Sequence, residues 1–153
     1  MDAADYDALV LIHPEYEILS PDYRTNLKRR IGDFRTLGRP VLVLPSDIDD
    51  PRLNRDMQVV EICKGLLVIP EFSDVSFPER KQKEVDFITS AVGKRHEQIV
   101  LGAGGMYGYD CVWTYTTSWC LDVETGREPY DIRENPPDRP LRLARYLDDI
   151  VYY

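Results

Sequence analysis

The 153 residues of this chain are the usual length of one domain, and we expect a single domain over residues 1–153. Hydrophobic residues make up 43% of the sequence and charged residues 30%, which excludes a disordered or fibrous protein. The formal net charge of −8 repels phosphate backbones and anionic lipids, so we expect no nucleic acid and no membrane surface as partner.

Four short apolar runs predict the strands of a sheet. They lie at about residues 8–12, 41–44, 66–69 and 98–101. None of these runs alternates with polar residues, as a strand with one solvent-exposed face would. Short continuous runs are instead typical of parallel strands that are covered on both faces.

Two of the segments between these runs contain both a start signal and a stop signal for a helix. Ser20 and Pro21 form a cap and a first-turn proline, Gly38 is a stop signal, and the apolar stripe between them is Leu27, Ile31, Phe34 and Leu37. The third predicted helix runs from Pro78 to Gly93 and buries Val85, Ile88 and Val92. Its expected polar face holds Glu79, Lys81, Lys83 and Glu84.

A second helix is predicted between these two by the same signals. Asp50 is its expected cap, Pro51 its first residue and Gly65 its end. Leu53, Met57 and Val60 provide the apolar face.

The pattern changes after Leu101. Residues 102–108 contain four glycines and predict a loop, but their spacing is not that of a dinucleotide fingerprint, so a flexible turn is the simpler interpretation. Residues 109–120 have the composition of a strand and the position of a helix, and we favour the helix.

The C-terminal part of the chain contains two further predicted elements. Residues 130–132 suggest a fifth strand. The chain is expected to close with an amphipathic helix carrying Leu141, Ala144, Leu147 and Val151.

Strand–helix–strand units in series imply right-handed crossovers between parallel strands. We therefore predict a three-layer α/β fold, with a Rossmann-like, doubly wound and mostly parallel sheet of about four to six strands. An antiparallel α+β fold is the alternative.

Candidate site residues follow from this fold, because ligands bind beyond the carboxyl ends of parallel strands. His13 follows the first run and could act as a base that Glu15 orients. Asp47 follows the second run and Glu71 the third. The glycine-rich segment contributes the remaining candidate ligand-binding residues: Gly104, Gly105, Tyr107 and Tyr109.

Cys111 lies three residues after Gly108, where the N-terminus of a helix could lower the pKa of its thiol. The alternative is a small buried hydrophobic side chain. The three cysteines include no CxxC pair, and the chain has two histidines, so we expect no disulfide framework, no tightly bound metal and no cofactor.

The segment from Ile69 to Ser73, the helix ending at Gly93, the run Ile99–Gly102 and then Cys111 have a spacing that resembles the isochorismatase-like cysteine hydrolases. The resemblance covers the order of elements over about residues 8–120 and implies the same α/β sheet, with Cys111 at the nucleophile position. Two positions depart from the family. His13 occupies the position at which the family has an aspartate, and Glu71 lies near the position at which the family has a lysine. A carboxylate near the thiol opposes ionisation instead of promoting it.

Two functions remain open at this point. The first is a non-catalytic or catalytically degenerate domain that binds a small molecule or a protein. The second is a cysteine hydrolase with Cys111 as nucleophile and His13 as base, acting on an amide or vinyl-ether type substrate, with Glu71 as a further carboxylate in the cleft.

The sequence also predicts the cellular location and the oligomeric state of the protein. We expect a cytoplasmic protein, because the first residues are acidic where a secretory signal is basic and no apolar run approaches the ~20 residues that span a bilayer. We also expect a homo-oligomer, because Trp113, Trp119, Tyr152 and Tyr153 are more aromatic surface than a small domain readily covers.

Overall fold

The structure is a computed structural model, and it describes residues 3–16, 20–46, 54–127 and 135–153. Its strands are β1 (Ala8–Ile12), β2 (Val41–Leu44), β3 (Leu67–Val68), β4 (Val100–Met106), β5 (Cys120–Glu124) and β6 (Leu141–Tyr152). Its α-helices are α1 (Pro21–Thr36), α2 (Met57–Ile62), α3 (Phe77–Val92) and α4 (Cys111–Trp119). Two short 3₁₀ helices, Ala3–Asp5 and His96–Gln98, precede β1 and β4.

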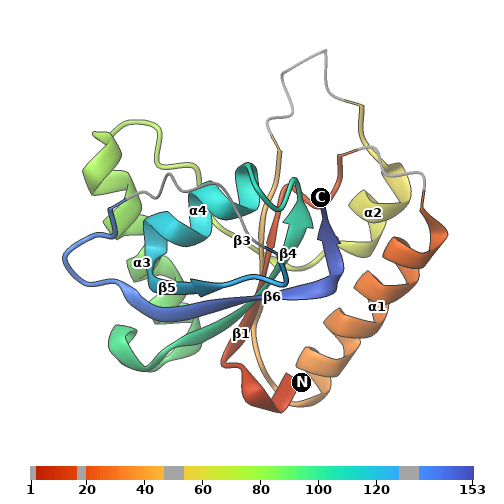
Figure 1. Cartoon of the computed structure of the whole chain (residues 1–153), viewed down its shortest axis with the longest axis horizontal. Helices are drawn as coiled ribbons and strands as arrows, with labels where there is room; N and C mark the ends of the chain where they lie inside the picture. The colour runs from red at the N-terminus through yellow and green to blue at the C-terminus, as the bar shows by residue number, and fades with distance from the viewer. Residues whose placement is uncertain (1–2, 17–19, 47–53, 128–134) are drawn as a thin grey trace.

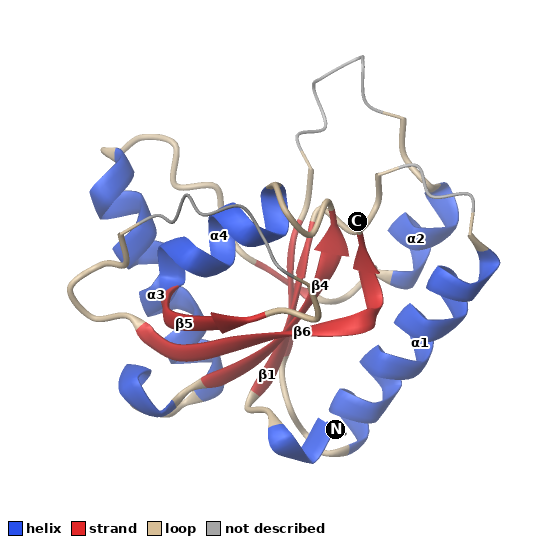
Figure 2. Cartoon of the chain, viewed as in Figure 1, coloured by secondary structure: helices blue, strands red, loops and turns tan. Residues whose placement is uncertain are grey.

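The strands form one sheet in the order β3-β2-β1-β4-β6-β5, and each of its five neighbouring pairs is parallel. Helices α1 and α2 cover one face and α3 and α4 the other, so the molecule has three layers (Figures 1 and 2). This confirms the predicted three-layer α/β fold with a parallel sheet. Within the described residues, no helix combines the length and the apolar content needed to cross a bilayer.

The central strand β1 shows why its sequence is an unbroken apolar run. All five of its side chains are fully buried. Ala8, Val10 and Ile12 face α3 and α4, whereas Leu9 and Leu11 face α1 and α2. Because neither face meets water, no polar residue interrupts the strand.

The helix boundaries of α1 and α3 agree with their sequence signals. The Ser20 side chain accepts a hydrogen bond from the Tyr23 amide at the start of α1, and Gly93 ends α3 with a left-handed φ of 76°. Helix α2 is shorter than predicted, because it begins only at Met57, directly after its cap residue Asp56. Met57 was placed on the apolar face, but it is exposed because it lies in the first turn of α2. Asp50 and Pro51 lie outside the described residues.

The prediction of a glycine-rich loop at residues 102–108 is wrong up to Met106, because β4 continues through it between β1 and β6. A side chain at Gly104 would begin 2.6 Å from Cδ1 of Ile150, and one at Gly105 would begin 2.0 Å from the carbonyl oxygen of Ile12. Gly105 also has a φ of 135°. These glycines therefore permit close packing in the middle of a sheet.

The predicted closing helix is also wrong, because residues 141–152 form strand β6. The pairing of β6 with β4 is irregular: Tyr146 is opposite Ala103, but Val151 is opposite Gly105. The extra residues of β6 form a bulge that turns Leu147 and Ile150 towards α1. This bulge gives apolar spacings that imitate the period of a helix.

Asp149 fastens the bulge to α1. Its carboxylate forms salt bridges with Arg29 and Arg30, the latter at 3.0 Å, and its backbone oxygen accepts a hydrogen bond from Asn26. Several charge-assisted hydrogen bonds on one carboxylate hold the bulge more firmly than an isolated surface pair would.

The structure exposes less aromatic surface than the prediction of a homo-oligomer assumed. Trp119 is fully buried in the core, and Trp113 is half-buried. Tyr152 keeps an exposed side chain. A homo-oligomer stays a prediction, with less exposed aromatic surface to support it.

The fifth strand predicted at 130–132 lies outside the described residues, and β5 instead begins at Cys120, directly after α4.

Two glycine substitutions test the close packing around β4. Gly105→Ala should cost more than about 3 kcal/mol in the free energy of unfolding, because its methyl group would overlap the backbone of Ile12. Gly32→Ala is the matched control: this position is helical and has open space around it, so the change should gain about 0.5–1 kcal/mol. Urea unfolding of the three proteins measures both effects. A Gly105→Ala protein as stable as the wild type would contradict the packing described here.

Candidate functional site

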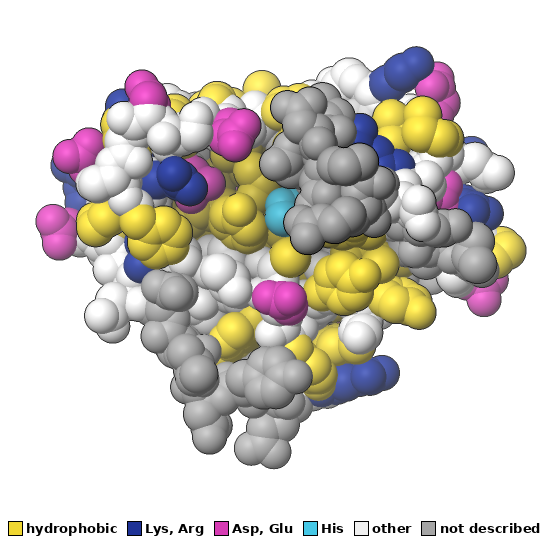
Figure 3. Space-filling view, turned by 90° about the horizontal axis from the view of Figure 1, so that it is seen from above, with side chains coloured by type: hydrophobic (Ala, Val, Ile, Leu, Met, Phe, Trp, Pro, Cys, Tyr) yellow, Lys and Arg dark blue, Asp and Glu magenta, His cyan; other side chains and the backbone are white. Residues whose placement is uncertain are grey.

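The carboxyl ends of β1, β2 and β4 form the edge of the sheet at which a site is expected. Figure 3 looks onto this edge and shows apolar side chains across its middle, with acidic and basic side chains beside them. His13 follows β1 directly, and its amide donates a hydrogen bond of 2.8 Å to the carbonyl of Leu44 at the end of β2. The first two strands therefore end together.

His13 has an unusual backbone and an unusual side-chain environment. Its φ is 47°, in the left-handed region that residues other than glycine rarely adopt. Its Nδ1 atom is buried and has no hydrogen-bond partner. The ring lies between Tyr16 and Tyr115, with centroid distances of 5.6 and 5.7 Å. Burial lowers the pKa of His13, although Glu15 and Asp110 act in the opposite direction.

Glu15 connects the loops after β1 and β2 inside the protein. Its buried carboxylate accepts hydrogen bonds from both the backbone amide and the hydroxyl of Ser46. Its backbone oxygen accepts a further hydrogen bond of 2.7 Å from the amide of Asp56, the cap of α2. Glu15 therefore holds the edge of the site together, and one of its carboxylate oxygens is already occupied.

Two hollows meet at His13 and Tyr115. The first has a volume of about 400 Å³ and includes Ser46 and the exposed Glu71. Its other lining residues are mostly apolar: Tyr16, Leu44, Pro45, Val68, Ile69 and Pro70. The second hollow, of about 210 Å³, lies between α3 and α4 and includes Cys111. The structure thus places His13, Glu71 and Cys111 at one edge of the sheet, with His13 between the other two.

The second hollow is more strongly charged than the sequence suggested. Besides His13 and Cys111, its lining includes several residues that were not predicted as site residues: Phe77, Arg80, Lys81, Glu84, Asp110, Thr114, Tyr115 and Ser118. A signal for two of these residues was present. Lys81 and Glu84 continue, one turn earlier, the apolar stripe that Val85 and Ile88 begin, so charged residues occupy the buried face of α3.

Lys81 and Glu84 were assigned to the polar face of their helix, and the structure corrects this, because both are buried. The Lys81 ammonium donates a hydrogen bond of 2.8 Å to the carbonyl of Asn135 and lies 4.8 Å from the centre of the Phe77 ring. Glu84 accepts a hydrogen bond of 3.2 Å from the indole nitrogen of Trp119. Burial raises the pKa of Glu84, and the Trp119 hydrogen bond and the Arg80 charge oppose that rise.

Cys111 is the first residue of α4, but its thiol is not activated. Burial, together with the charge of the neighbouring Asp110, raises its pKa to about 11, and a hydrogen bond from its own backbone opposes this rise only in part. Among the described contacts, no hydrogen bond joins the thiol to His13. At neutral pH the thiol is protonated.

The other predicted ligand residues are distributed differently. Gly104 and Gly105 are packed inside the sheet. Tyr107 is about half exposed at 45%, with a left-handed φ of 60°, and its ring lies 5.6 Å from that of Tyr16. Tyr109 instead packs against Tyr153, with a centroid distance of 4.9 Å. Asp47 lies outside the described residues.

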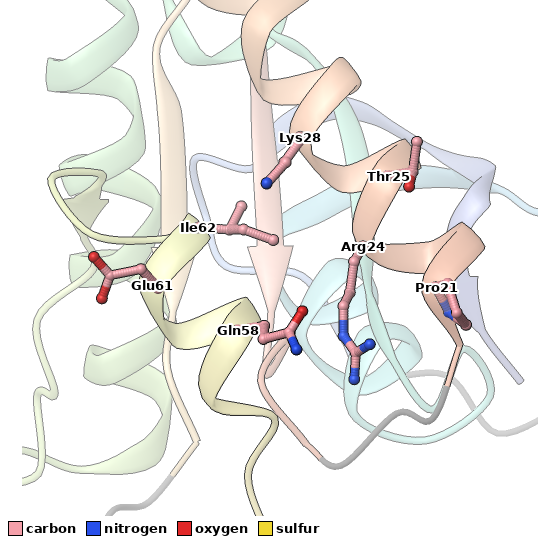
Figure 4. A pocket seen from close by; sticks show the side chains of 7 residues that line it. All are labelled: Pro21, Arg24, Thr25, Lys28, Gln58, Glu61 and Ile62. Carbon is pink, nitrogen blue, oxygen red and sulfur yellow. The ribbon is translucent and has the colours of Figure 1, made fainter.

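A further hollow, of about 490 Å³, lies between α1 and α2 (Figure 4). Lys28 and Gln58 point into the space between the helices, whereas Glu61 turns outward and pairs with Lys64 at 2.8 Å. Arg24 is held by Asp56, which also caps α2. This hollow is open, and the Arg24–Asp56 ion pair joins α1 to the cap of α2, so we attribute the hollow to helix packing.

In the part of the chain that the structure describes, no group of three His, Cys, Asp or Glu side chains is arranged to hold a metal ion. Comparison with known proteins adds no assignment: no family model, no curated protein and no solved structure matches this chain. The function therefore has to be argued from the site itself.

Removing the charge of Glu84 should stabilise the protein in a pH-dependent way. Its folded pKa lies above the ordinary value, so this residue's stabilising contribution is present below pH ~4.5 and is lost as pH rises through the folded pKa. Glu84→Gln should therefore match the wild type at about pH 4 and be the more stable protein at about pH 8. Urea unfolding at both pH values measures this difference.

The exposed Glu79 on the same helix is the control for this test, and Glu79→Gln should change the free energy of unfolding by less than about 0.5 kcal/mol. A Glu84→Gln protein that is less stable than the wild type at about pH 8 would show that the buried carboxylate is favoured in the folded state.

Cys111 should react slowly with iodoacetamide. With a pKa of about 11, its thiolate population near neutral pH, and hence its alkylation rate, should be roughly two orders of magnitude below that of an unfolded-chain cysteine. Mass spectrometry of the modified site measures the rate, with the urea-unfolded protein as reference. His13→Ala should leave the rate unchanged. A fast rate near pH 6 that is lost in His13→Ala would instead identify a base–thiol pair.

Proposed function

We propose that this domain binds a small polar molecule at the carboxyl edge of its sheet, in the two hollows that meet at His13. The observation that carries the proposal is the state of His13: a left-handed backbone, a buried Nδ1 without a partner and a ring placed between two hollows. A buried unsatisfied polar atom costs about 1–3 kcal/mol, and such costs persist mainly where function requires them.

The environment of His13 favours one protonation state. Its lowered pKa keeps the ring neutral near pH 7, so only one ring nitrogen carries a proton. A buried N–H without an acceptor is rarer in proteins than a buried acceptor without a donor, so we assign the proton to Nε2. In this tautomer Nε2 is a hydrogen-bond donor, and it is suited to bind a carbonyl or carboxylate oxygen of a ligand.

The same tautomer argues against the cysteine hydrolase. A general base needs a lone pair within hydrogen-bond reach of the thiol proton. In the assigned tautomer Nε2 is protonated, the lone pair of Nδ1 is buried, and Cys111 retains its proton because its pKa is raised. The related proposal of a degenerate relative of isochorismatase-like hydrolases is compatible with these features, since the hollow at Cys111 contains neither an available base at His13 nor a thiolate.

Ligand-observed and protein-observed NMR together test the binding proposal. The probe is a library of small polar fragments that contains free amino acids, carboxylic acids, amines and amides. The chain has two histidines, so the ring Cε1–Hε1 signals of His13 and His96 report on two separate places. Binders should shift the His13 signal and leave the His96 signal unchanged.

Two variants complete the test. His13→Asn should weaken binding about tenfold or more, because asparagine tolerates a left-handed φ but does not replace the ring. His96→Asn is the control and should bind as the wild type does. The proposal is overturned if no fragment shifts the His13 signal, or if His13→Asn binds as tightly as the wild type. A fragment that is hydrolysed by the wild type but not by Cys111→Ser would support the hydrolase instead.

A further inference from the structure

The hollow between α3 and α4 contains a guanidinium group and a carboxylate that do not pair with each other. Arg80 comes from the first turns of α3 and Asp110 from the residue before α4, and both line the same space of about 210 Å³. No salt bridge joins them among the described ion pairs. Unpaired opposite charges on the wall of one hollow are the feature of this site that its packing does not explain.

Arg80 is oriented but only partly used. Its Nε atom donates a hydrogen bond of 3.0 Å to the carbonyl oxygen of Phe72, which fixes the plane of the guanidinium group. Among the described residues, its two terminal amino groups have no hydrogen bond or salt bridge. A guanidinium group held in this way can bind both oxygens of a carboxylate at once.

Asp110 occupies the cap position of α4 without capping it. Its backbone angles, φ −122° and ψ −95°, are not those of an ordinary cap, and its side chain accepts no hydrogen bond from the helix. Its charge nevertheless acts on both His13 and Cys111: it contributes to the raised pKa of Cys111 and partly offsets the lowering of the His13 pKa by burial. The carboxylate therefore lies beside the site and is available to a positively charged group.

We propose that this hollow binds a free amino acid or a closely similar zwitterion, a ligand class that rests on the small-molecule function proposed above. Arg80 holds the ligand carboxylate, Asp110 holds its ammonium group, and Phe77 and Tyr115 contact its side chain. An anion alone would leave Asp110 and Glu84 facing it, and a cation alone would face Arg80. A ligand with both charges satisfies both walls.

The size and the basic groups of the hollow agree with this ligand. Its volume is below the roughly 300–1,000 Å³ of pockets for drug-sized molecules, so it suits a compact metabolite. Lys81 also lines the hollow, but its ammonium group is engaged with the Asn135 carbonyl and the Phe77 ring. This leaves Arg80 as the anchor for a carboxylate.

Isothermal titration of the wild-type protein with three matched probes tests the inference without any substitution. The probes are L-leucine, isocaproate, which lacks the ammonium group, and isoamylamine, which lacks the carboxylate. L-Leucine should bind. Each singly charged probe should bind with an affinity lower by at least about tenfold, because each loses one charge-assisted interaction. Glycine and L-alanine, titrated in parallel, show whether the hollow prefers a smaller side chain.

Charge-matched variants then assign the two contacts. Arg80→Gln should remove the advantage of L-leucine over isoamylamine, and Asp110→Asn should remove its advantage over isocaproate. Lys83→Gln and Asp86→Asn make the same charge changes on the exposed surface of α3 and should leave all affinities unchanged. If Arg80→Gln does not fold, Arg80→Lys takes its place in the test. It keeps the charge but loses the planar guanidinium group, and it should weaken the binding of L-leucine.

The inference is overturned if none of the three amino acids binds, or if isocaproate or isoamylamine binds as tightly as L-leucine. If other fragments still shift the His13 signal in that case, the small-molecule function stands and only the ligand class is wrong. If no probe shifts the His13 signal, both proposals fail together.

Discussion

The close approach of three backbones in the middle of the sheet is the constraint on which the rest of the structure depends. Strand β4 lies between β1 and β6, and Gly105 allows the carbonyl of Ile12 to come nearer than any side chain would permit. Ile12 is the last residue of β1, so this contact also sets where the chain turns into His13. The same glycine-rich strand that packs the core therefore positions the residue on which the binding proposal rests.

The bulge of β6 is the counterpart of this constraint on the other side of β4. Because Gly104 has no side chain, Ile150 can fold over it, and the irregular pairing lets β6 contribute apolar residues to both faces of the sheet. The salt bridges of Asp149 with α1 then hold the bulge in place. Sheet packing and helix packing are thus linked through one irregular strand.

The charges around the second hollow are costly for stability and informative for function. Burial disfavours the carboxylate of Glu84 and raises its pKa, and the hydrogen bond from Trp119 and the charge of Arg80 offset this only in part. Perturbed groups of this kind gather at binding and catalytic sites. Here they accompany a protonated thiol and a neutral histidine. The combination supports ligand binding better than nucleophilic attack.

Local signals in the sequence determined the elements whose ends and faces depend on near neighbours. The N-terminal cap of α1, the glycine that ends α3 and the apolar runs of β1 and β2 act within a few residues, and they were predicted correctly. Only the tertiary structure decided the course of β4 and β6, because Gly104 and Ile150 are distant in sequence and their contact makes a strand from segments that resemble a loop and a helix. The hollow that unites Arg80 and Asp110 likewise arises from two helices packed on one face of the sheet, a proximity that no local pattern encodes.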